Sequence, residues 1–334
     1  MSGVVLGLDI GGANLKAATA AGRAETVPFA LWKHPDRLGA VLAELAAKFP
    51  EATELAVTMT GELCDCYETK RQGVNAILDA VEFARKCLPV RVWGTDEKFH
   101  SIETSRSQVM LVAASNWHAL ATFAGRFAPT GNAKLIDIGS TTADLIPLKD
   151  GLPNSRGKTD PERLVTHELV YNGVRRTPIS AVVRHRRSRP FGLIASELFA
   201  TTLDAYLVLG SIAEDPSDTD TADGRAATVP LAKARLARML GGDIETIPGG
   251  TIYALAAEVE TTQLDLLATA EASDGREART FLLAGAGEFL ARLLFQRYRY
   301  GDVELISLAE KLGPVVSTCA PAYALAVLGT ERRP

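Results

Sequence analysis

The chain has 334 residues, 47% of them apolar and 23% charged, which at roughly 150 residues per domain is enough for two domains. Its formal net charge of −4 argues against a general nucleic-acid-binding protein, which would carry a clustered basic excess. No apolar run approaches the roughly 20 residues of a membrane span, and the chain opens on a strand-like run rather than a signal peptide. Four cysteines are too few for a disulfide scaffold. We expect a cytoplasmic protein that acts on small molecules, with neither nucleic acid nor membrane as partner, and we leave a homodimer open.

The first half of the chain alternates strand and helix patterns. A buried strand from Val4 enters a turn at Gly11-Gly12, and extended structure resumes at residues 16–20, which predicts a β-hairpin. The further elements expected are an amphipathic helix at 36–48 capped by Asp36, a strand at 55–59, a helix at 74–88 and one long alanine-rich helix at 109–127.

The second half repeats the opening pattern. Residues 134–142 again form a strand that ends in Asp-Ile-Gly, and 143–148 return as a second strand, which indicates two related halves. An acidic loop at 214–224 follows. The remaining elements expected are helices at 231–240 and 252–271, a strand at 281–284, a helix from Glu288 and a small-residue helix at 318–328. This alternation predicts an α/β fold.

Two glycine turns are candidate phosphate sites. A backbone approaches phosphate closely only where Cβ is absent, and successive N–H groups in a tight turn bind anions. The turn residues expected to bind phosphate or nucleotide are Gly11, Gly12, Asn14, Gly139, Ser140, Thr141 and Thr142. Asp9 and Asp137 stand where each strand enters its turn. If the turns face each other, these carboxylates can hold a hydrated Mg²⁺ and Lys16 can meet phosphate charge.

A third glycine pair lies at Gly285-Ala286-Gly287, between a strand and a helix. Bare backbone there suits a nucleobase or a ribose. The same pattern also makes a tight strand-to-helix connection, and taken alone the pattern favours the connection. Whether ATP binds at this loop is therefore left open.

Order and spacing of these motifs resemble a known superfamily. Three motifs resemble those of the actin, sugar kinase and heat-shock chaperone superfamily. The phosphate-1 motif corresponds to Asp9-x-Gly-Gly with Lys16, and the phosphate-2 motif to Asp137-x-Gly-x-Thr-x-x-Asp144. The adenosine motif corresponds to Ala284-Gly-Ala-Gly. The resemblance covers most of the chain and implies two actin-like (ribonuclease H-like) domains with a ligand cleft between them. We place the first domain at residues 1–106 plus 318–334 and the second at 107–317.

A narrower resemblance points to the hydantoinase A and oxoprolinase-like branch. The phrases that are similar lie at 59–63, 69–74, 114–117, 159–164, 168–178 and 221–224. Together with the short length they look like the members linked to tetrahydromethanopterin-dependent one-carbon metabolism. The resemblance implies a transferase that condenses an aminomethylfuran-methyl diphosphate with the phenol of a γ-glutamyl tyramine- or tyrosine-type acceptor. Diphosphate is released, and the product belongs to methanofuran or methylofuran biosynthesis.

Such a reaction needs charge neutralisation on the leaving diphosphate, a positioned phenol and a base. Asp9, Asp137 and Lys16, with Mg²⁺, serve the first need. The residues leave the base open between Asp144 and Glu168.

Three further assignments follow from the resemblance. Asn116 is expected to line the cleft, Arg176 to meet a carboxylate or a phosphate, and Asp223 of the acidic loop to meet the substrate. A basic run at 184–189 reads as a surface segment.

Two other functions stay open beside the transferase. One is an ATP-dependent small-molecule kinase or a hydantoinase/oxoprolinase-like enzyme of the same superfamily. The other is a nucleotide-regulated binding protein.

Overall fold

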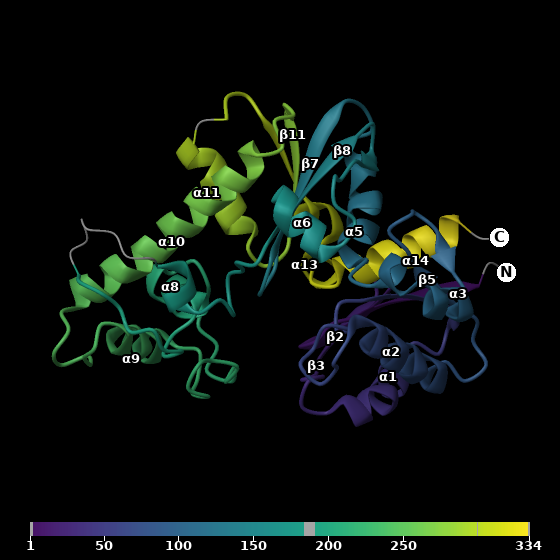
Figure 1. The fold of residues 1–334 in the computed structure, drawn as a ribbon, viewed down its shortest axis with the longest axis horizontal. Helices are drawn as coiled ribbons and strands as arrows, with labels where there is room; N and C mark the ends of the chain where they lie inside the picture. The colour runs from purple at the N-terminus through teal and green to yellow at the C-terminus, as the bar shows by residue number, and fades with distance from the viewer. Residues whose placement is uncertain (1–2, 184–190, 299, 333–334) are drawn as a thin grey trace.

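The computed structural model describes residues 3–183, 191–298 and 300–332, so the basic run at 184–189 lies outside the described residues. The chain forms two lobes, each built on a six-stranded sheet (Figure 1). The first sheet has the order β3-β2-β1-β4-β5-β6. Its strands are β1 Val4–Ile10, β2 Asn14–Thr19, β3 Ala24–Pro28, β4 Ala52–Met59, β5 Val90–Trp93 and β6 Phe99–His100.

Helices cover both faces of the first sheet, because strand side chains alternate between the two faces. Leu6, Leu8 and Ile10 of β1 pack in one core with α1 (Leu38–Ala47) and α2 (Lys70–Ala84). Val5 points the other way, into a core with α14 (Ala320–Glu331). Figure 1 shows α1 and α2 below this sheet and α14 above it.

The second sheet repeats the topology of the first. Its order is β10-β8-β7-β11-β12, with β9 paired to β8. The strands are β7 Asn132–Ile138, β8 Ala143–Lys149, β9 Leu152–Pro153, β10 Leu169–Val170, β11 Thr280–Ala284 and β12 Glu304–Ser307. In both lobes an antiparallel meander is followed by two parallel strands. This duplication confirms the predicted α/β fold of two actin-like domains.

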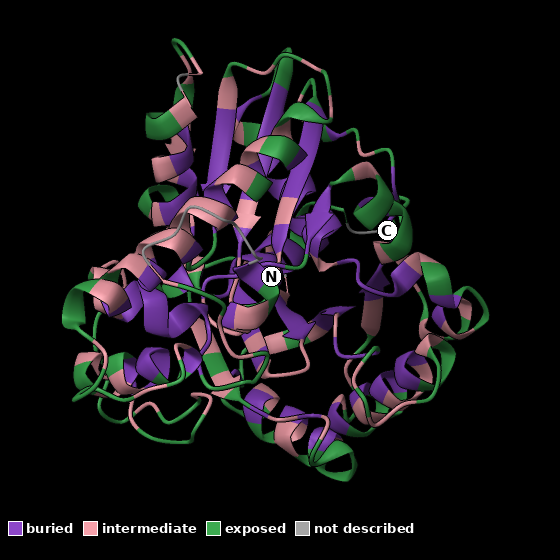
Figure 2. Cartoon of the chain, turned by 60° about the vertical axis from the view of Figure 1, so that its left-hand side comes forward, coloured by how far each residue is buried: buried purple, intermediate pink, exposed green. Residues whose placement is uncertain are grey.

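The second sheet is also covered on both faces, and its strands are largely buried (Figure 2). One face packs on α10 (Gly249–Ala272) and α11 (Glu288–Tyr298), and the other on α5 (Asn116–Ala124). Helix α5 also packs on α14, with Ala119 and Phe123 in the core of the first lobe. The α5–α14 pair therefore joins the two lobes.

A helical part extends from the second lobe at the lower left of Figure 1. It has its own apolar core, formed by α7 (Ile179–Val182), α8 (Thr202–Leu209), α9 (Val229–Met239) and one end of α10. The remaining short elements are α3 Ile102–Ser107, α4 Val109–Val112, α6 Asp160–Thr166, α12 Leu308–Leu312, α13 Pro314–Ser317 and the 3₁₀ turns Pro35–Arg37 and Gly125–Phe127. No helix within the described ranges is both long and apolar enough to cross a bilayer.

Two local predictions were wrong. The single helix expected at 109–127 is broken into α4, α5 and a 3₁₀ turn, because Ala114 adopts a positive φ of 48°. Helix α1 begins at Leu38, after the 3₁₀ turn, and no side chain of the described chain caps it, so Asp36 is not its cap.

The domain boundary at 106/107 stays a prediction. Val109, Val112 and Ala113 pack in the same core as β1, α1 and α2. This packing favours a boundary after residue 113.

Candidate active site

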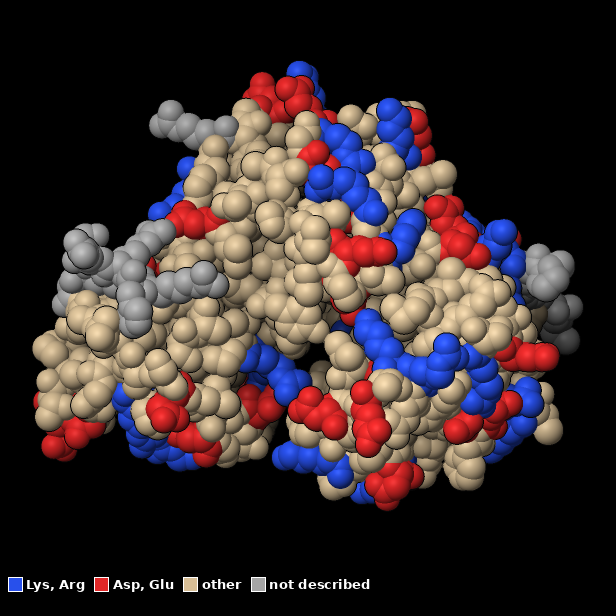
Figure 3. Space-filling view, viewed as in Figure 1, with Lys and Arg blue, Asp and Glu red and all other residues tan. Residues whose placement is uncertain are grey.

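A cavity of about 850 Å³ is lined by both lobes. Both glycine turns open onto it, the β1–β2 turn from one lobe and the β7–β8 turn from the other. The space-filling view shows a notch between the first lobe and the helical part of the second, with Lys and Arg side chains along part of its edge (Figure 3). The structure therefore brings together two turns that are 128 residues apart in the sequence.

The two turns have the same construction. The Gly11 N–H donates to the Asn14 carbonyl at 3.0 Å, and the Gly139 N–H donates to the Thr142 carbonyl at 2.8 Å. A Cβ at Gly12 would lie 2.6 Å from the Cys64 Sγ, so this position has no room for a side chain. Such short glycine turns leave backbone N–H groups for an anion.

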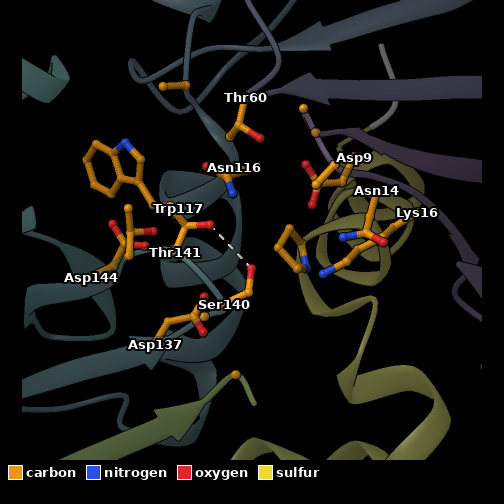
Figure 4. A pocket seen from close by; sticks show the side chains of 18 of the residues that line it. Asp9, Asn14, Lys16, Thr60, Asn116, Trp117, Asp137, Ser140, Thr141 and Asp144 are labelled. Carbon is orange, nitrogen blue, oxygen red and sulfur yellow. Dashed lines mark hydrogen bonds between the residues drawn. The ribbon is translucent and has the colours of Figure 1, made fainter. Parts of the chain in front are cut away.

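Strand register fixes the charged residues beside each turn. Asp9 of β1 is directly opposite Lys16 of β2, and Asp137 of β7 is directly opposite Asp144 of β8. Directly opposed residues of an antiparallel pair point to the same face. Figure 4 shows the Asp9–Lys16 pair on one side of the cavity and Asp137 and Asp144 on the other.

Burial dominates the electrostatics of these carboxylates. It raises the pKa of Asp9, which the positive charge of Lys16 opposes. The pKa of Asp137 rises to about 7, first through burial and then through the negative charges of Asp144 and Asp9, against Lys16. The pKa of Asp144 is also raised by burial, against the charge of Arg163. The site thus concentrates negative charge that a cation would relieve.

These residues fit a divalent cation. Asp9 Oδ1 is buried and has no hydrogen-bond partner among the residues that the structure describes. The described chain holds no group of three or more His, Cys, Asp or Glu side chains suited to a metal. Mg²⁺ commonly takes one or two carboxylates and completes its shell with water and substrate phosphate, and carboxylates such as Asp9 and Asp137 have the donor chemistry that it prefers.

Asp144 is engaged by Arg163. Arg163 Nη2 lies 2.5 Å from Asp144 Oδ1, and its guanidinium stacks over the Trp117 ring at 4.1 Å. Arg163 is 1% exposed, so this ion pair is shielded from solvent. Asp144 therefore lines the cavity with its charge already balanced.

Glu168 is not at the cavity, so its assignment as a base is corrected. Its carboxylate accepts hydrogen bonds from the Arg156 N–H, the Gly157 N–H and the Thr166 hydroxyl at 2.7 to 2.9 Å. It is buried among these donors and does not line the cavity. Its function is to hold the loop before α6.

The substrate assignment of Asp223 is corrected in the same way. Asp223 lies in the helical part, where its carboxylate accepts from Arg235 at 3.0 Å and from Arg225. Burial raises the pKa of Asp223, but the hydrogen bonds from Arg225 and Arg235 and the charge of Arg235 together outweigh it and lower the pKa to about 2. Asp223 neutralises the fully buried Arg235 together with Asp204 and does not line the cavity.

The adenosine-like loop packs against the second turn. Gly285 has a φ of 84°, and a Cβ there would lie 2.4 Å from Asp137 Oδ1. Gly287 does not line the cavity, because it packs on Ile138 and its N–H donates to the Ile138 carbonyl at 2.8 Å. Packing thus requires both glycines, and Gly285 also lines the cavity.

The other predicted residues all lie at the cavity. They are Gly11, Gly12, Asn14, Lys16, Asn116, Gly139, Ser140, Thr141, Thr142 and Arg176. Asn116 reaches it because the positive φ of Ala114 starts α5 at that point. Arg176 stacks over Trp32 at 5.1 Å.

Gly173 and Glu62, to which the sequence assigned no role, lie beside the second turn and in the cavity wall. Gly173 supports the second turn, since a Cβ there would lie 2.4 Å from the Ser140 carbonyl carbon and the Thr141 nitrogen. Glu62 is buried at the cavity wall with one unpartnered oxygen within the described structure. Both stand in phrases that carried the family resemblance, but nothing in the sequence showed their contacts.

Known proteins are similar to this chain over most of its length. The family model described as hydantoinase/oxoprolinase matches residues 54–332. A protein of Methanocaldococcus jannaschii named "(4-{4-[2-(gamma-L-glutamylamino)ethyl]phenoxymethyl}furan-2-yl)methanamine synthase" is 33% identical over 332 residues, covering 97% of both chains. A protein of Methanococcus vannielii with the same name is 32% identical over 201 residues, 59% of this chain and 90% of its own.

Solved structures share the fold at low identity. The nucleotide-free acetone carboxylase structure aligns with 98% of this chain and 70% of its own, with a TM-score of 0.54 and 12% identity. The PilM–PilN type IV pilus biogenesis complex aligns with 99% of each chain, with a TM-score of 0.52 and 13% identity. These likenesses concern the fold alone.

Proposed function

The chain belongs to the hydantoinase/oxoprolinase family, and on this basis we propose that it is a transferase that forms an aryl ether in methanofuran-type cofactor assembly. It joins an aminomethylfuran-methyl diphosphate to the phenol of a γ-glutamyl tyramine- or tyrosine-type acceptor and releases diphosphate. The observation that carries the proposal is the match along 97% of both chains to a synthase whose name describes such an ether.

The cleft suits the chemistry of that ether. A phenol oxygen must attack a furylmethyl carbon while the bond from that carbon to the leaving group breaks. The furan ring delocalises the developing cation, so the protein mainly needs to neutralise the departing diphosphate and to position the phenol. Two glycine turns that face one cavity supply N–H groups for a ligand with two phosphates.

The residues divide between the two tasks. Lys16 and the hydroxyls of Ser140, Thr141 and Thr142 meet the diphosphate together with the turn amides. Asp9 and Asp137 hold a Mg²⁺ ion, which when bound would neutralise diphosphate charge. Asn116 and Arg176 lie at the same cavity and contact the acceptor.

We propose that the reaction proceeds without ATP. A transferase that displaces diphosphate needs no adenosine pocket, and packing on Asp137 and Ile138 accounts for both glycines of the adenosine-like loop. Nothing in the described chain specifically favours the kinase alternative.

An incubation of the purified protein with Mg²⁺, the furfuryl diphosphate and γ-glutamyltyramine tests this function. Mass spectrometry should detect the ether and an equal amount of diphosphate with no nucleotide present. Formation of ADP, or an ether that forms only when ATP is added, would support the kinase-like alternative instead.

A further inference from the structure

The proposed ether synthesis needs an acceptor for the phenolic proton. In the described chain six carboxylates line the cavity: Asp9, Glu62, Asp65, Asp137, Asp144 and Asp160. Two of them, Asp9 and Asp137, stand at the phosphate turns, where the diphosphate and its cation would engage them. The choice of base is therefore among the other four.

Three of those four are unsuited. Asp144 is 2.5 Å from Arg163, and Asp160 is 3.0 Å from Lys70, so each carboxylate is held by a cation. Asp65 is exposed, so water competes with a substrate for its carboxylate oxygens. Glu62 is the remaining candidate.

Glu62 is a buried carboxylate with spare hydrogen-bonding capacity. It follows β4, is 1% exposed, and its Oε2 has no partner in the part of the chain that the structure describes. Lys70 Nζ lies 3.9 Å from its Oε1, farther than from Asp160. Burial raises the pKa of Glu62 to about 7, against the charge of Lys70. A base with a pKa near the working pH accepts protons efficiently.

The backbone of Glu62 is fixed in place. Gly73 of α2 packs directly on it, since a Cβ at Gly73 would lie 2.1 Å from the Glu62 carbonyl oxygen. The loop that carries Glu62 is therefore packed closely on α2 where it lines the cavity.

Aromatic side chains in the same cavity as Glu62 offer a surface on which an aromatic acceptor can pack. Tyr171 and Trp117 line the same cavity, and the Trp117 Nε1–H is buried without a partner among the described atoms. Burial raises the pKa of Tyr171, and the charges of Asp160, Glu62 and Asp144 raise it further, so these groups face one space.

We propose that Glu62 is the general base that accepts the phenolic proton. The inference rests on the proposed function. As the carbon–oxygen bond to diphosphate breaks, its electron pair leaves with the diphosphate. A lone pair of the phenol oxygen forms the new bond to the furylmethyl carbon, and the phenolic proton passes to Glu62, which later releases it to water.

The first test is the pH profile of the Glu62→Gln variant. Among the residues that the structure describes, the charged and titratable groups that face Glu62 are Lys70 of α2, Asp160 of α6, Tyr171 and, on its own loop, Cys64. In the wild type kcat/KM should fall as pH drops below about 7. At saturating Mg²⁺, which would keep Asp9 and Asp137 ionised, that acid limb should disappear in Glu62→Gln and kcat should fall about 10²- to 10⁴-fold. The affinity for Mg²⁺–diphosphate should be unchanged, which shows an intact cleft.

The second test uses an acceptor whose phenol is acidified by fluorine atoms on both ortho positions, assayed at a pH where it is already ionised. This acceptor needs no base, so the deficit of Glu62→Gln should largely vanish with it. Glu68→Gln, an exposed carboxylate on the same loop, is the control and should behave as the wild type with both phenols.

The outcomes separate this inference from the proposed function. A wild-type kcat and acid limb in Glu62→Gln, or an equal deficit with both phenols, would overturn the role of Glu62 while leaving the transferase intact. A wild-type protein that makes no ether would overturn the proposed function and this role with it.

Discussion

Lys70 Nζ and Asp160 Oδ2 lie 3.0 Å apart and join the two lobes beside the cleft. Lys70 begins α2 of the first lobe, and Asp160 begins α6 of the second. Both side chains are mostly buried, at 15% and 16% exposed, so solvent screens the pair only partly. The pair also sets the charge around Glu62, which Lys70 stabilises as an anion and Asp160 destabilises.

Replacing Lys70 and replacing Asp160 should shift the acid limb of the kcat/KM profile in opposite directions. Lys70→Met removes the cation that lowers the pKa of Glu62, so the limb should move to higher pH. Asp160→Asn removes a negative charge and frees Lys70, so the limb should move to lower pH. Lys48→Met breaks an exposed ion pair with Glu25 and serves as the control. If the acid limb of kcat/KM lies at the wild-type pH in both variants, this ion pair does not influence the catalytic base.

Replacing the carboxylates at the two turns should abolish turnover without unfolding the protein. Asp9→Asn and Asp137→Asn should each lower diphosphate release at least about 100-fold, because each removes charge that would hold the cation. Their melting temperatures should not fall, since burial disfavours both charges. The exposed Asp36→Asn is the matched control. Full activity of both variants at saturating Mg²⁺ would remove the two residues from the mechanism.

Two glycines of the second lobe should respond differently to alanine. At Gly139 the atom of the described chain nearest to an added Cβ would be the Thr142 carbonyl oxygen, at 3.5 Å. This is an ordinary contact distance, so the free energy of unfolding of Gly139→Ala should change by less than about 0.5 kcal/mol. Because Gly139 lines the cavity, the methyl group should weaken diphosphate binding. Gly173→Ala should instead cost about 1–3 kcal/mol, because its Cβ would overlap the Ser140–Thr141 backbone.

Urea unfolding and calorimetry with Mg²⁺–diphosphate measure the two effects. The prediction fails if Gly139→Ala is the less stable variant, or if it binds diphosphate as the wild type does.

Buried His118 should make the protein sensitive to acid. Burial lowers the pKa of His118 from 6.5 to about 3, so the folded state keeps it neutral while the unfolded state takes up a proton. The contribution of His118 to stability should therefore be full above pH 6.5 and decline as pH falls toward 3, by up to about 1.4 kcal/mol per pH unit.

The variant His118→Gln should flatten that decline, since its amide oxygen can still accept from Trp93 Nε1–H. Urea denaturation at neutral and acidic pH measures it, with the exposed His34→Gln as control. An equal loss in His118→Gln and the wild type would contradict the assignment.

Local patterns were sufficient to predict the two turns. The order of a strand, the motif Asp-x-Gly and a second strand predicts a hairpin. In the structure the register of that hairpin places Asp9 opposite Lys16. The repeat of that pattern then predicted Asp137 and its turn. Such features depend on neighbours in sequence, which is why they could be predicted before the structure was known.

Long-range partners could not be predicted in this way. The residues next to Asp223 in the sequence do not show that Arg235 neutralises it. The residues next to Glu168 do not show that its carboxylate accepts hydrogen bonds from several backbone amides. The break at Ala114 is a left-handed alanine, which local propensity disfavours and only tertiary packing can impose. The burial of Glu62 likewise results from α2 packing on its loop.

A crystal structure of the protein with Mg²⁺ and diphosphate tests the central claim most directly. The account predicts one diphosphate in the cleft, with phosphate oxygens on the amides of both the Gly11–Gly12 turn and the Gly139–Thr142 turn, and Mg²⁺ beside Asp9 and Asp137. Diphosphate bound outside the cleft, or bound by one turn with the other left free, would contradict it.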